Sequence, residues 1–495
     1  MAWLKRVNDR IPKRAVLGVL MFLACMFSYV IRTNLSIAIV AMVSVKKGRK
    51  GPFCTDLLLN STRPTIPDID ERYPWSQQIQ GVVLSAYFVG PLLSSVPSGM
   101  LAEKFGGARV VAYATLIPAL LNLLMPVVSG WHWSVVVILR FLMGFSGSAV
   151  YPALHAMIAR WAPPVEKGRF VWTMQGGPFG AFVTFTLCSL IISALGWKAA
   201  FYITSGAMLA FWLLWVWLAY DTPDSHPTIT ESERSYIREQ IGTSVSKQKL
   251  ALPISAMAKS PPFLVLLWAH FANMWGIYFL SSNGPKYTLE ILGLDMSSGG
   301  FLTGLPYIAR LGAGALFAAF GDFFRKRNIL SVIWIRKLFM IFSHVGPGVS
   351  LLIMTYVECN AFAAIAMMIL ALALNGAACQ TSLQNHQDLA PNYAGSLYGV
   401  MNVFGSVPGF IIPAAVGALT NHHNGVDEWR WMFWISAVVF FSATVLFWIF
   451  GSASIQPWND TSKIVSLNNP DEEKKINEVN GKEIAQSDEE ENERL

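Results

Sequence analysis

The sequence predicts an all-α membrane protein with twelve transmembrane helices arranged as two six-helix bundles. Of its 495 residues, 54% are hydrophobic and 14% are charged, whereas a soluble protein carries about 25% charged residues. The apolar residues gather in twelve runs, each long enough to cross a bilayer. One polar stretch near the middle of the chain divides these runs into two sets of six.

Each run is predicted to form a helix, because lipid offers no hydrogen-bond partners and a helix pairs its own backbone groups. The first six runs lie at 15–44, 79–101, 108–128, 134–157, 170–194 and 199–219. The second six lie at 263–284, 298–321, 332–356, 361–383, 394–420 and 430–451.

The polar segments set the domain boundaries. We divide the chain into a cytoplasmic N-terminus (1–14), an N-terminal bundle (15–220), a cytoplasmic linker (221–262), a C-terminal bundle (263–451) and a tail (452–495). The linker contains "DTPDSHPTITESERSYIREQ", and the acidic tail is almost free of large apolar side chains. Such a tail cannot bury enough apolar surface to fold, so we expect it to be disordered.

Basic residues in the short loops predict the orientation of the chain in the membrane. Lys and Arg cluster at 5–14, 160–169 and 325–327, which fall on one side if there are twelve spans, and the positive-inside rule makes that side cytoplasmic. Both termini are therefore expected in the cytoplasm. The loop 45–78 is also basic and disagrees, but its "NST" sequon makes Asn60 a candidate glycosylation site on the outer side.

The two halves resemble each other in sequence. "GMLAEKFGGAR" (99–109) follows the second span, and "AAFGDFFRKR" (318–327) follows the eighth. "ARWAPPVEKGRF" follows the fourth span and "HQDLAPNYAGSLYG" the tenth. Repeated six-helix halves are typical of secondary transporters, whose substrate site lies between the halves near the middle of the membrane.

These motifs resemble the major facilitator superfamily. "GMLAEKFGGAR" is similar to its loop signature, with Glu103 where Asp is usual. "RTNLSIAIVAMV", "YPALHAMIARWAPP", "FYITSGAMLAFWLLWVWLAYDTP" and "NHQDLAPNYAGSLYGVMNVFGSVPG" resemble the branch of sialin, the vesicular glutamate transporters, the type I sodium–phosphate cotransporters and insect inorganic phosphate cotransporters. The resemblance implies transport of organic anions or phosphate. Its matched residues are Arg32, Arg140, His155, Asn385, His386 and Asp388.

The chain also departs from this branch. Met143 and Gly147 stand where sialin-like proteins carry glutamates implicated in proton coupling, and Asn273 stands where glutamate transporters have an arginine. These departures argue against a vesicular glutamate transporter. They leave phosphate, sialic acid, acidic amino acids and urate-like anions open as substrates.

Three arginines lie well inside predicted spans, and no Asp or Glu does. Arg32, Arg140 and Arg310 each face a cost of at least a few kcal/mol in hydrocarbon, so we expect a water-filled cavity in which the substrate is the counter-ion. A guanidinium suits this role because its fork matches a carboxylate or phosphate. Alternatively, Arg140 snorkels to the outer surface and Arg310 is a helix-terminal anchor. Arg336 is expected to reach water at the start of its span.

The candidate site residues form two groups. The substrate-binding group is Arg32, Arg140, His270, Asn273, Tyr278, Tyr307 and Arg310, although His270 and the two tyrosines could equally serve packing. The gating group is Glu103, Arg109, His155, Asp322, Arg325, His386 and Asp388. Glu103 and Arg109, with Asp322 and Arg325, are expected to latch the cytoplasmic side when the cavity opens outward.

The predicted function is secondary active transport of small anions by alternating access. No cofactor is expected. Sodium is the candidate coupling ion, because no intramembrane carboxylate is available to carry a proton; the alternatives are a proton-coupled, sialin-like exporter and a potential-driven uniporter. The expected partners are a small anion and the lipid bilayer, without nucleic acid and without a second subunit, in the plasma membrane or a lysosomal or vesicular membrane. An enzyme is disfavoured because neither H-x-x-x-H nor C-x-x-C metal spacing occurs.

Two cysteines are expected on the outer side of the membrane. Cys54 lies in the first outer loop and Cys359 in the loop after the ninth span, whereas Cys25, Cys188 and Cys379 fall within spans. The outer face of secretory-route membranes is oxidising. We therefore predict a disulfide between Cys54 and Cys359.

Overall fold

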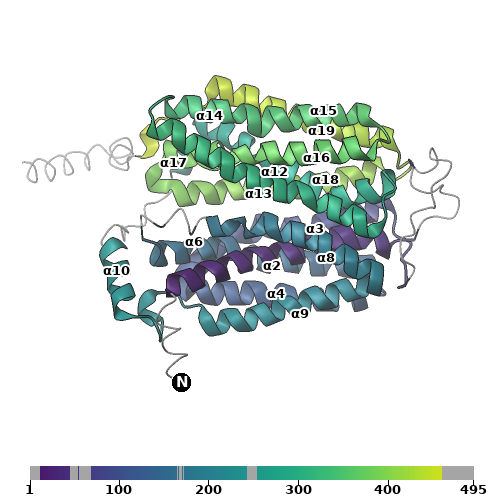
Figure 1. Ribbon diagram of the computed structural model, residues 1–495, viewed down its shortest axis with the longest axis horizontal. Coiled ribbons are helices and arrows are strands. Elements are labelled where there is room, and N and C mark those ends of the chain that lie inside the picture. The colour runs from purple at the N-terminus through teal and green to yellow at the C-terminus, as the bar shows by residue number, and fades with distance from the viewer. Residues whose placement is uncertain are drawn as a thin grey trace, which may run out of the picture.

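The computed structural model describes residues 12–44, 54, 69–163, 166, 170, 172–241 and 253–459, and it places them in two helical bundles that lie side by side (Figure 1). The first bundle contains α2 (Lys13–Met42), α3 (Gln77–Phe105), α4 (Gly107–Val128), α5 (Trp133–Gly147) with α6 (Val150–Trp161), η2 (Thr173–Gln175) with α8 (Gly176–Leu195), and α9 (Trp197–Leu218). The second contains α12 (Pro261–Lys286) with η4 (Tyr287–Ile291), α13 (Met296–Lys326), α14 (Val332–Met340) with η5 (Ile341–Val345) and α15 (Gly346–Val357), α16 (Ala361–Asn375) with η6 (Gly376–Gln380) and α17 (Asn385–Leu389), α18 (Ala394–Leu419) and α19 (Val426–Phe450).

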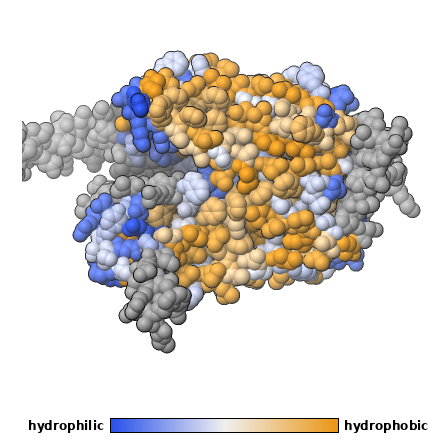
Figure 2. All heavy atoms as spheres, viewed as in Figure 1, coloured by the Kyte–Doolittle hydropathy of each residue, from blue (hydrophilic) through white to orange (hydrophobic). Residues whose placement is uncertain are grey.

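All twelve predicted spans are therefore helical. Eleven of these helices are long and apolar enough to cross a membrane on composition alone. The remaining one is α3, whose glutamines, serines and two internal prolines lower its hydropathy. Figure 2 shows an apolar belt around the flank of the molecule and hydrophilic residues at its two ends, as a membrane protein requires.

The end that carries Lys13, α10 (Glu231–Ile241) and residue 459 is called the inner end, and the opposite end, with Cys54, the outer end. At the inner end, the linker helix α10 caps α2. The Glu233 carboxylate accepts hydrogen bonds from the backbone N–H groups of Lys13 (2.9 Å) and Arg14 (3.1 Å). A carboxylate at a helix N-terminus is stabilised by the helix dipole. Arg14 adds an ion pair to Glu166 and lies over the ring of Tyr236.

Two further helices begin at a glycine that a distant aspartate approaches. Gly106 has φ +96°, and the Asp221 carboxylate accepts a 2.7 Å hydrogen bond from Ala108 at the start of α4. Gly196 has φ +86°, and the Asp70 carboxylate caps α9 in the same way. A side chain on either glycine would collide with the aspartate, so these turns need glycine for both conformation and space.

The two bundles touch along their outer halves. A Cβ atom at Gly81 of α3 would lie 2.4 Å from the Pro413 carbonyl oxygen of α18 and 3.1 Å from Gly417. Ser85 of α3 also donates a 2.8 Å hydrogen bond to the carbonyl of Phe410. On the other side of the interface, Gly300 of α13 packs against α8. The outer end is therefore closed.

The same helices separate toward the inner end. No atom lies within 4 Å of the Cβ position at Gly99 of α3 or at Gly399 of α18. Gly312 of α13 is equally open. Figure 2 shows a notch between the bundles at this end. The described part of the chain is thus open at its inner end and closed at its outer end.

The predicted disulfide is confirmed. Cys54 and Cys359 are bonded, with Cα atoms 5.2 Å apart and a sequence separation of 305 residues. The backbone N–H of Cys54 also donates a 3.1 Å hydrogen bond to the carbonyl of Ile291. The first outer loop is therefore joined to the second bundle. Asn60, the candidate glycosylation site, lies outside the described residues.

The linker and the start of the tail contain more structure than the sequence suggested. The linker includes η3 (Pro223–Ser225), α10 and α11 (Ile254–Ala258). Residues 451–459 fold back under the second bundle, where Trp458 is buried beside Phe263 and Leu389. Residues 1–11 and 460–495 lie outside the described part of the chain.

Candidate functional site

Arg32 lies about 15 Å from the outer end of α2, since ten residues follow it in the helix. Its guanidinium is surrounded by aromatic faces, with Cζ 5.1 Å from the ring centre of Tyr29, 5.8 Å from Tyr87 and 4.6 Å from Phe88. The nearest ring, at 4.4 Å, is that of Tyr278 on α12 of the other bundle. Aromatic faces stabilise a cation without neutralising it. Arg32 therefore brings a net positive charge to the boundary between the bundles.

Arg310 brings a second charge from the other bundle. It lies in the middle of α13, which begins at Met296, so it is not a helix-terminal anchor. Its Nε donates a 3.1 Å hydrogen bond to the Asn375 side chain. Tyr29 and Tyr307 each lie within electrostatic range of both Arg32 and Arg310. The two arginines therefore share one tyrosine-lined region.

Arg140 does not snorkel, because its side chain is 1% exposed. Its guanidinium donates hydrogen bonds to the α2 carbonyls of Ile31 (3.3 Å) and Arg32 (3.0 Å) and lies 4.8 Å over the ring of Tyr87. The sequence predicted that this guanidinium binds the substrate. In this conformation it holds the backbone beneath Arg32 instead.

No carboxylate of the described chain pairs with Arg32, Arg140 or Arg310; the ion pairs that are present lie near the ends of the helices and in the loops. Within the same residues, no cluster of His, Cys, Asp or Glu is arranged to hold a metal ion. The site is thus electropositive, and an anion is the ligand that it suits best.

Two further candidates on α12 are completely buried. His270 and Asn273 are each 0% exposed, and neither the two ring nitrogens nor the amide atoms have a hydrogen-bond partner. Tyr307, also buried, donates from its hydroxyl to the carbonyl of Ile277 at 3.3 Å and so links α13 to α12. In this conformation a bulky substrate cannot reach His270 or Asn273.

The gating candidates gather near the inner end. The ring of Tyr398 on α18 lies 5.7 Å from that of His155 on α6 and 5.4 Å from that of His386 on α17. Because α6 and α18 belong to different bundles, the pair of His155 and Tyr398 crosses the interface.

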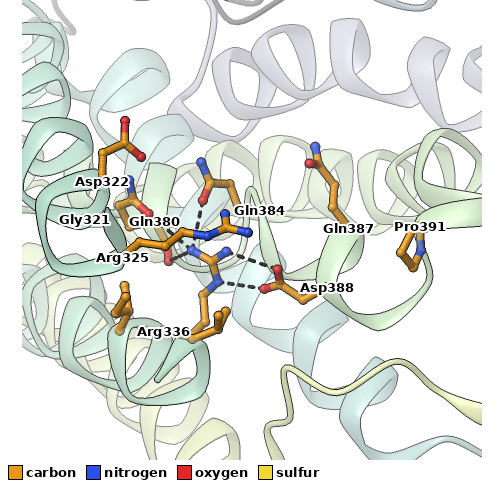
Figure 3. Close-up of a pocket in the computed structure, with 11 residues that line it drawn as sticks. Gly321, Asp322, Arg325, Arg336, Gln380, Gln384, Gln387, Asp388 and Pro391 are labelled. Carbon is orange, nitrogen blue, oxygen red and sulfur yellow. Dashed lines mark hydrogen bonds and ion pairs between the residues drawn. The ribbon is translucent and has the colours of Figure 1, made fainter. Parts of the chain in front are cut away.

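Asp388 pairs with an arginine that was expected to reach water. Arg336 is 3% exposed, and it forms a 2.8 Å ion pair with Asp388 and hydrogen bonds to Gln380 and Gln384 (Figure 3). The prediction that Arg336 reaches water is therefore wrong. The break between α16 and α17 supplies hydrogen-bond acceptors, so the guanidinium is paired while it is buried. These residues line a pocket of about 320 Å³.

The residues of the expected latch lie near the inner ends of α3, α4 and α13. Glu103 lies in the last turn of α3, and Arg109 is exposed in the first turn of α4. Asp322 and Arg325 are exposed near the end of α13 and border the Arg336 pocket. The latch of a closed inner end stays a prediction.

Sequence reasoning named Tyr278 but missed the other aromatic residues around Arg32. Tyr29 precedes Arg32 by one helical turn, so its position on the same face could have been recognised. Tyr87 and Phe88 lie on α3 and Tyr398 on α18, and only the packing of the helices brings them to the site. Nothing in the sequence indicated that Arg336 is buried and paired, because its partners follow it by about fifty residues.

The arrangement of two six-helix bundles with a notch between them at one end (Figure 2) agrees with the comparisons with known proteins. The Major Facilitator Superfamily matches residues 51–413. The chain belongs to this superfamily. It is therefore a membrane transporter and not an enzyme, as the sequence predicted.

Relatives in this superfamily support the branch that the sequence indicated. Human sialin is 30% identical over 454 residues, which cover 89% of this chain and 90% of sialin. Vesicular glutamate transporter 1 of Xenopus laevis is 30% identical over 456 residues, covering 90% of this chain and 76% of that protein.

Solved structures share the fold. The xylose transporter XylE from E. coli in an inward open conformation superposes with a TM-score of 0.62 at 12% identity, over 88% of this chain and 95% of XylE. A bacterial homologue of the human lysosomal transporter Spinster, in an inward-facing and occupied conformation, also gives 0.62 at 12% identity, over 89% and 97% of the two chains.

Proposed function

We propose that this protein transports small anions, organic or inorganic, by alternating access, and that Arg32 and Arg310 bind the anionic group from opposite bundles. A substrate that bridges the two arginines contacts both bundles at once, so its binding energy can drive their relative movement. Tyr278 and Tyr307 line the region between them.

One observation carries this proposal. Two guanidiniums from different bundles lie near the same tyrosines, and no carboxylate of the described chain neutralises either of them. Sites of this kind in secondary transporters lie between the halves at the middle of the membrane. An anion entering from the open inner end supplies the missing negative charge.

The names of the relatives narrow the candidates for the substrate. Because sialin and the vesicular glutamate transporters are relatives of this chain, sialic acid and glutamate are the first candidate substrates. Inorganic phosphate stays a candidate because a guanidinium fork also fits phosphate. The basic loops favour a cytoplasmic inner end. We further propose a monomer in the plasma membrane or a lysosomal or vesicular membrane. Sodium as the coupling ion stays a prediction.

Exchange in proteoliposomes tests the proposed function. Vesicles containing the purified protein are loaded with unlabelled anion, and uptake of labelled sialic acid, glutamate or phosphate is followed at equal pH and sodium on both sides. Exchange of one of these anions supports the proposal. The proposal fails if no anion is exchanged by wild-type protein, or if Arg32→Met and Arg310→Met exchange as fast as wild type.

A further inference from the structure

Four polar atoms in one turn of α12 lack partners. They are both ring nitrogens of His270 and both amide atoms of Asn273, in side chains that are 0% exposed. Most buried polar atoms in proteins are paired, so such a group needs an explanation such as an ion, a water molecule or a functional role. A large ligand cannot enter this space, but a proton and a water molecule can.

His270 belongs to a cluster that reaches toward the inner end. Its ring lies 6.2 Å from that of Tyr398, and the rings of His386 and His155 lie 5.4 Å and 5.7 Å from the same tyrosine. These four residues are called the histidine cluster. Ring centres at these separations are those of packed aromatic pairs, so the four side chains form one continuous cluster.

A path leads from this cluster to the inner surface. His386 lies two residues before Asp388, whose ion pair with Arg336 borders the 320 Å³ pocket (Figure 3). Chains of His and acidic residues are the usual proton carriers inside membrane proteins. Titratable side chains therefore follow one another from water to His270.

A glycine on α18 makes room for the imidazole. A Cβ atom at Gly405 would lie 2.8 Å from both Cδ2 and Nε2 of His270. Any other residue at this position would push the ring away from α18 and Tyr398. The backbone is therefore shaped around an imidazole that has no structural hydrogen bond.

We infer that His270 is the proton-binding site that couples a proton to anion transport. This inference rests on the proposed function. In the inner-open state, a proton from water in the pocket passes along His386 and Tyr398 to a ring nitrogen of His270. One N–H bond forms on His270 and one O–H bond of a hydronium ion breaks, and the same proton leaves when the site opens to the other side.

The protonated form of His270 has no counter-ion until the substrate binds. The titratable groups that face it are His344 of η5, His386 of α17 and Tyr398 of α18, and no acid of the described chain is among them. His344 is already bound to the carbonyl of Ala269 at 2.9 Å. An imidazolium at position 270 is therefore isolated until an anion enters.

The distance between the two charges sets the expected coupling. Tyr278, at the Arg32 site, is eight residues from His270 on α12, a rise of about 12 Å. At an effective dielectric constant of about 20, opposite charges at this separation attract enough to change an equilibrium about tenfold. By reciprocity, protonation strengthens anion binding by the same factor.

Exchange and driven uptake separate this inference from the proposed function. Both are measured in proteoliposomes with labelled sialic acid and labelled glutamate, at fixed sodium and clamped potential. Exchange at equal pH reports the anion site alone, whereas accumulation under an imposed pH gradient reports coupling. Absence of exchange in wild type contradicts the proposed function. Wild-type exchange without pH-driven accumulation contradicts only the histidine inference.

His270→Gln should reduce pH-driven accumulation at least tenfold more than it reduces exchange, and His422→Gln, in an exposed loop, should change neither. Equal accumulation by His270→Gln and wild type overturns the inference. If His270→Gln does not fold, the wild-type pH profile decides. Apparent affinity in exchange should rise as the pH falls from 8 to 4, by up to about tenfold once His270 is protonated, and a flat profile overturns the inference.

Discussion

Replacing Arg32 with methionine removes the guanidinium but keeps a flexible apolar side chain against the four surrounding rings. A bidentate guanidinium makes two charge-assisted hydrogen bonds to an anion, each contributing about 1.5–3 kcal/mol. Their loss lowers the binding free energy by about 3–6 kcal/mol, or at least about a hundredfold in affinity. Arg32→Lys keeps the charge and loses one of the two bonds, so its affinity should fall about tenfold to a hundredfold.

The same substitution should not weaken the fold. Arg32 has no carboxylate partner in the described chain, and an arginine at this depth costs about 2.5–3.5 kcal/mol. The thermal midpoint of Arg32→Met in detergent should therefore equal or exceed that of wild type. Apparent affinity is measured by exchange of labelled anion, and the midpoint by tryptophan fluorescence. Arg238→Met, which removes an exposed arginine of α10 at the inner end, is the matched control. Affinity within threefold of wild type for Arg32→Met would refute the reasoning.

Three further perturbations follow from the packing. Gly81→Ala puts a methyl group 2.4 Å from the Pro413 carbonyl oxygen, so labelling from the outer side of a cysteine introduced as Tyr278→Cys should increase, and an unchanged labelling rate would contradict the closed outer end. Arg336→Met leaves the Asp388 carboxylate unpaired and should cost about 3–5 kcal/mol; the double substitution with Asp388→Asn should cost less, and additive losses in thermal unfolding would exclude coupling. Burial, reinforced by neighbouring basic side chains, lowers the pKa of His226 in the folded protein. Its contribution to the free energy of unfolding is therefore fully present above the ordinary pKa near 6.5 and falls as the pH drops toward the folded value. In His226→Gln, the thermal midpoint should depend less on pH between pH 7 and 5.5 than it does in wild type.

The sequence predicted the spans because hydropathy depends on composition alone. It predicted α3 as well, although that helix is polar enough to fail a composition test. The disulfide followed from topology, since Cys54 and Cys359 are the two cysteines outside the predicted spans. These features depend on which side of the membrane a residue occupies, and charge and apolar length determine that side.

The partners of the buried arginines could not be predicted. Arg140 binds carbonyl oxygens of α2, and every residue carries such an oxygen, so no pattern of residue types marks the contact. Arg336 finds its acceptors where α16 gives way to α17. Both contacts depend on the relative position of two helices, which is a property of packing rather than of either segment.

The disulfide gives the molecule a second covalent connection between its halves. The linker joins them at the inner end, and the bond between Cys54 and Cys359 joins them at the outer end, so the chain forms a closed ring through both bundles. Cys54 follows Met42 by twelve positions in the sequence, a stretch that can span about 40 Å when extended, so the ring can follow a rocking movement. After a protease cuts within 242–252, the two fragments would therefore remain covalently joined. On a denaturing gel they would separate only when a reductant is added.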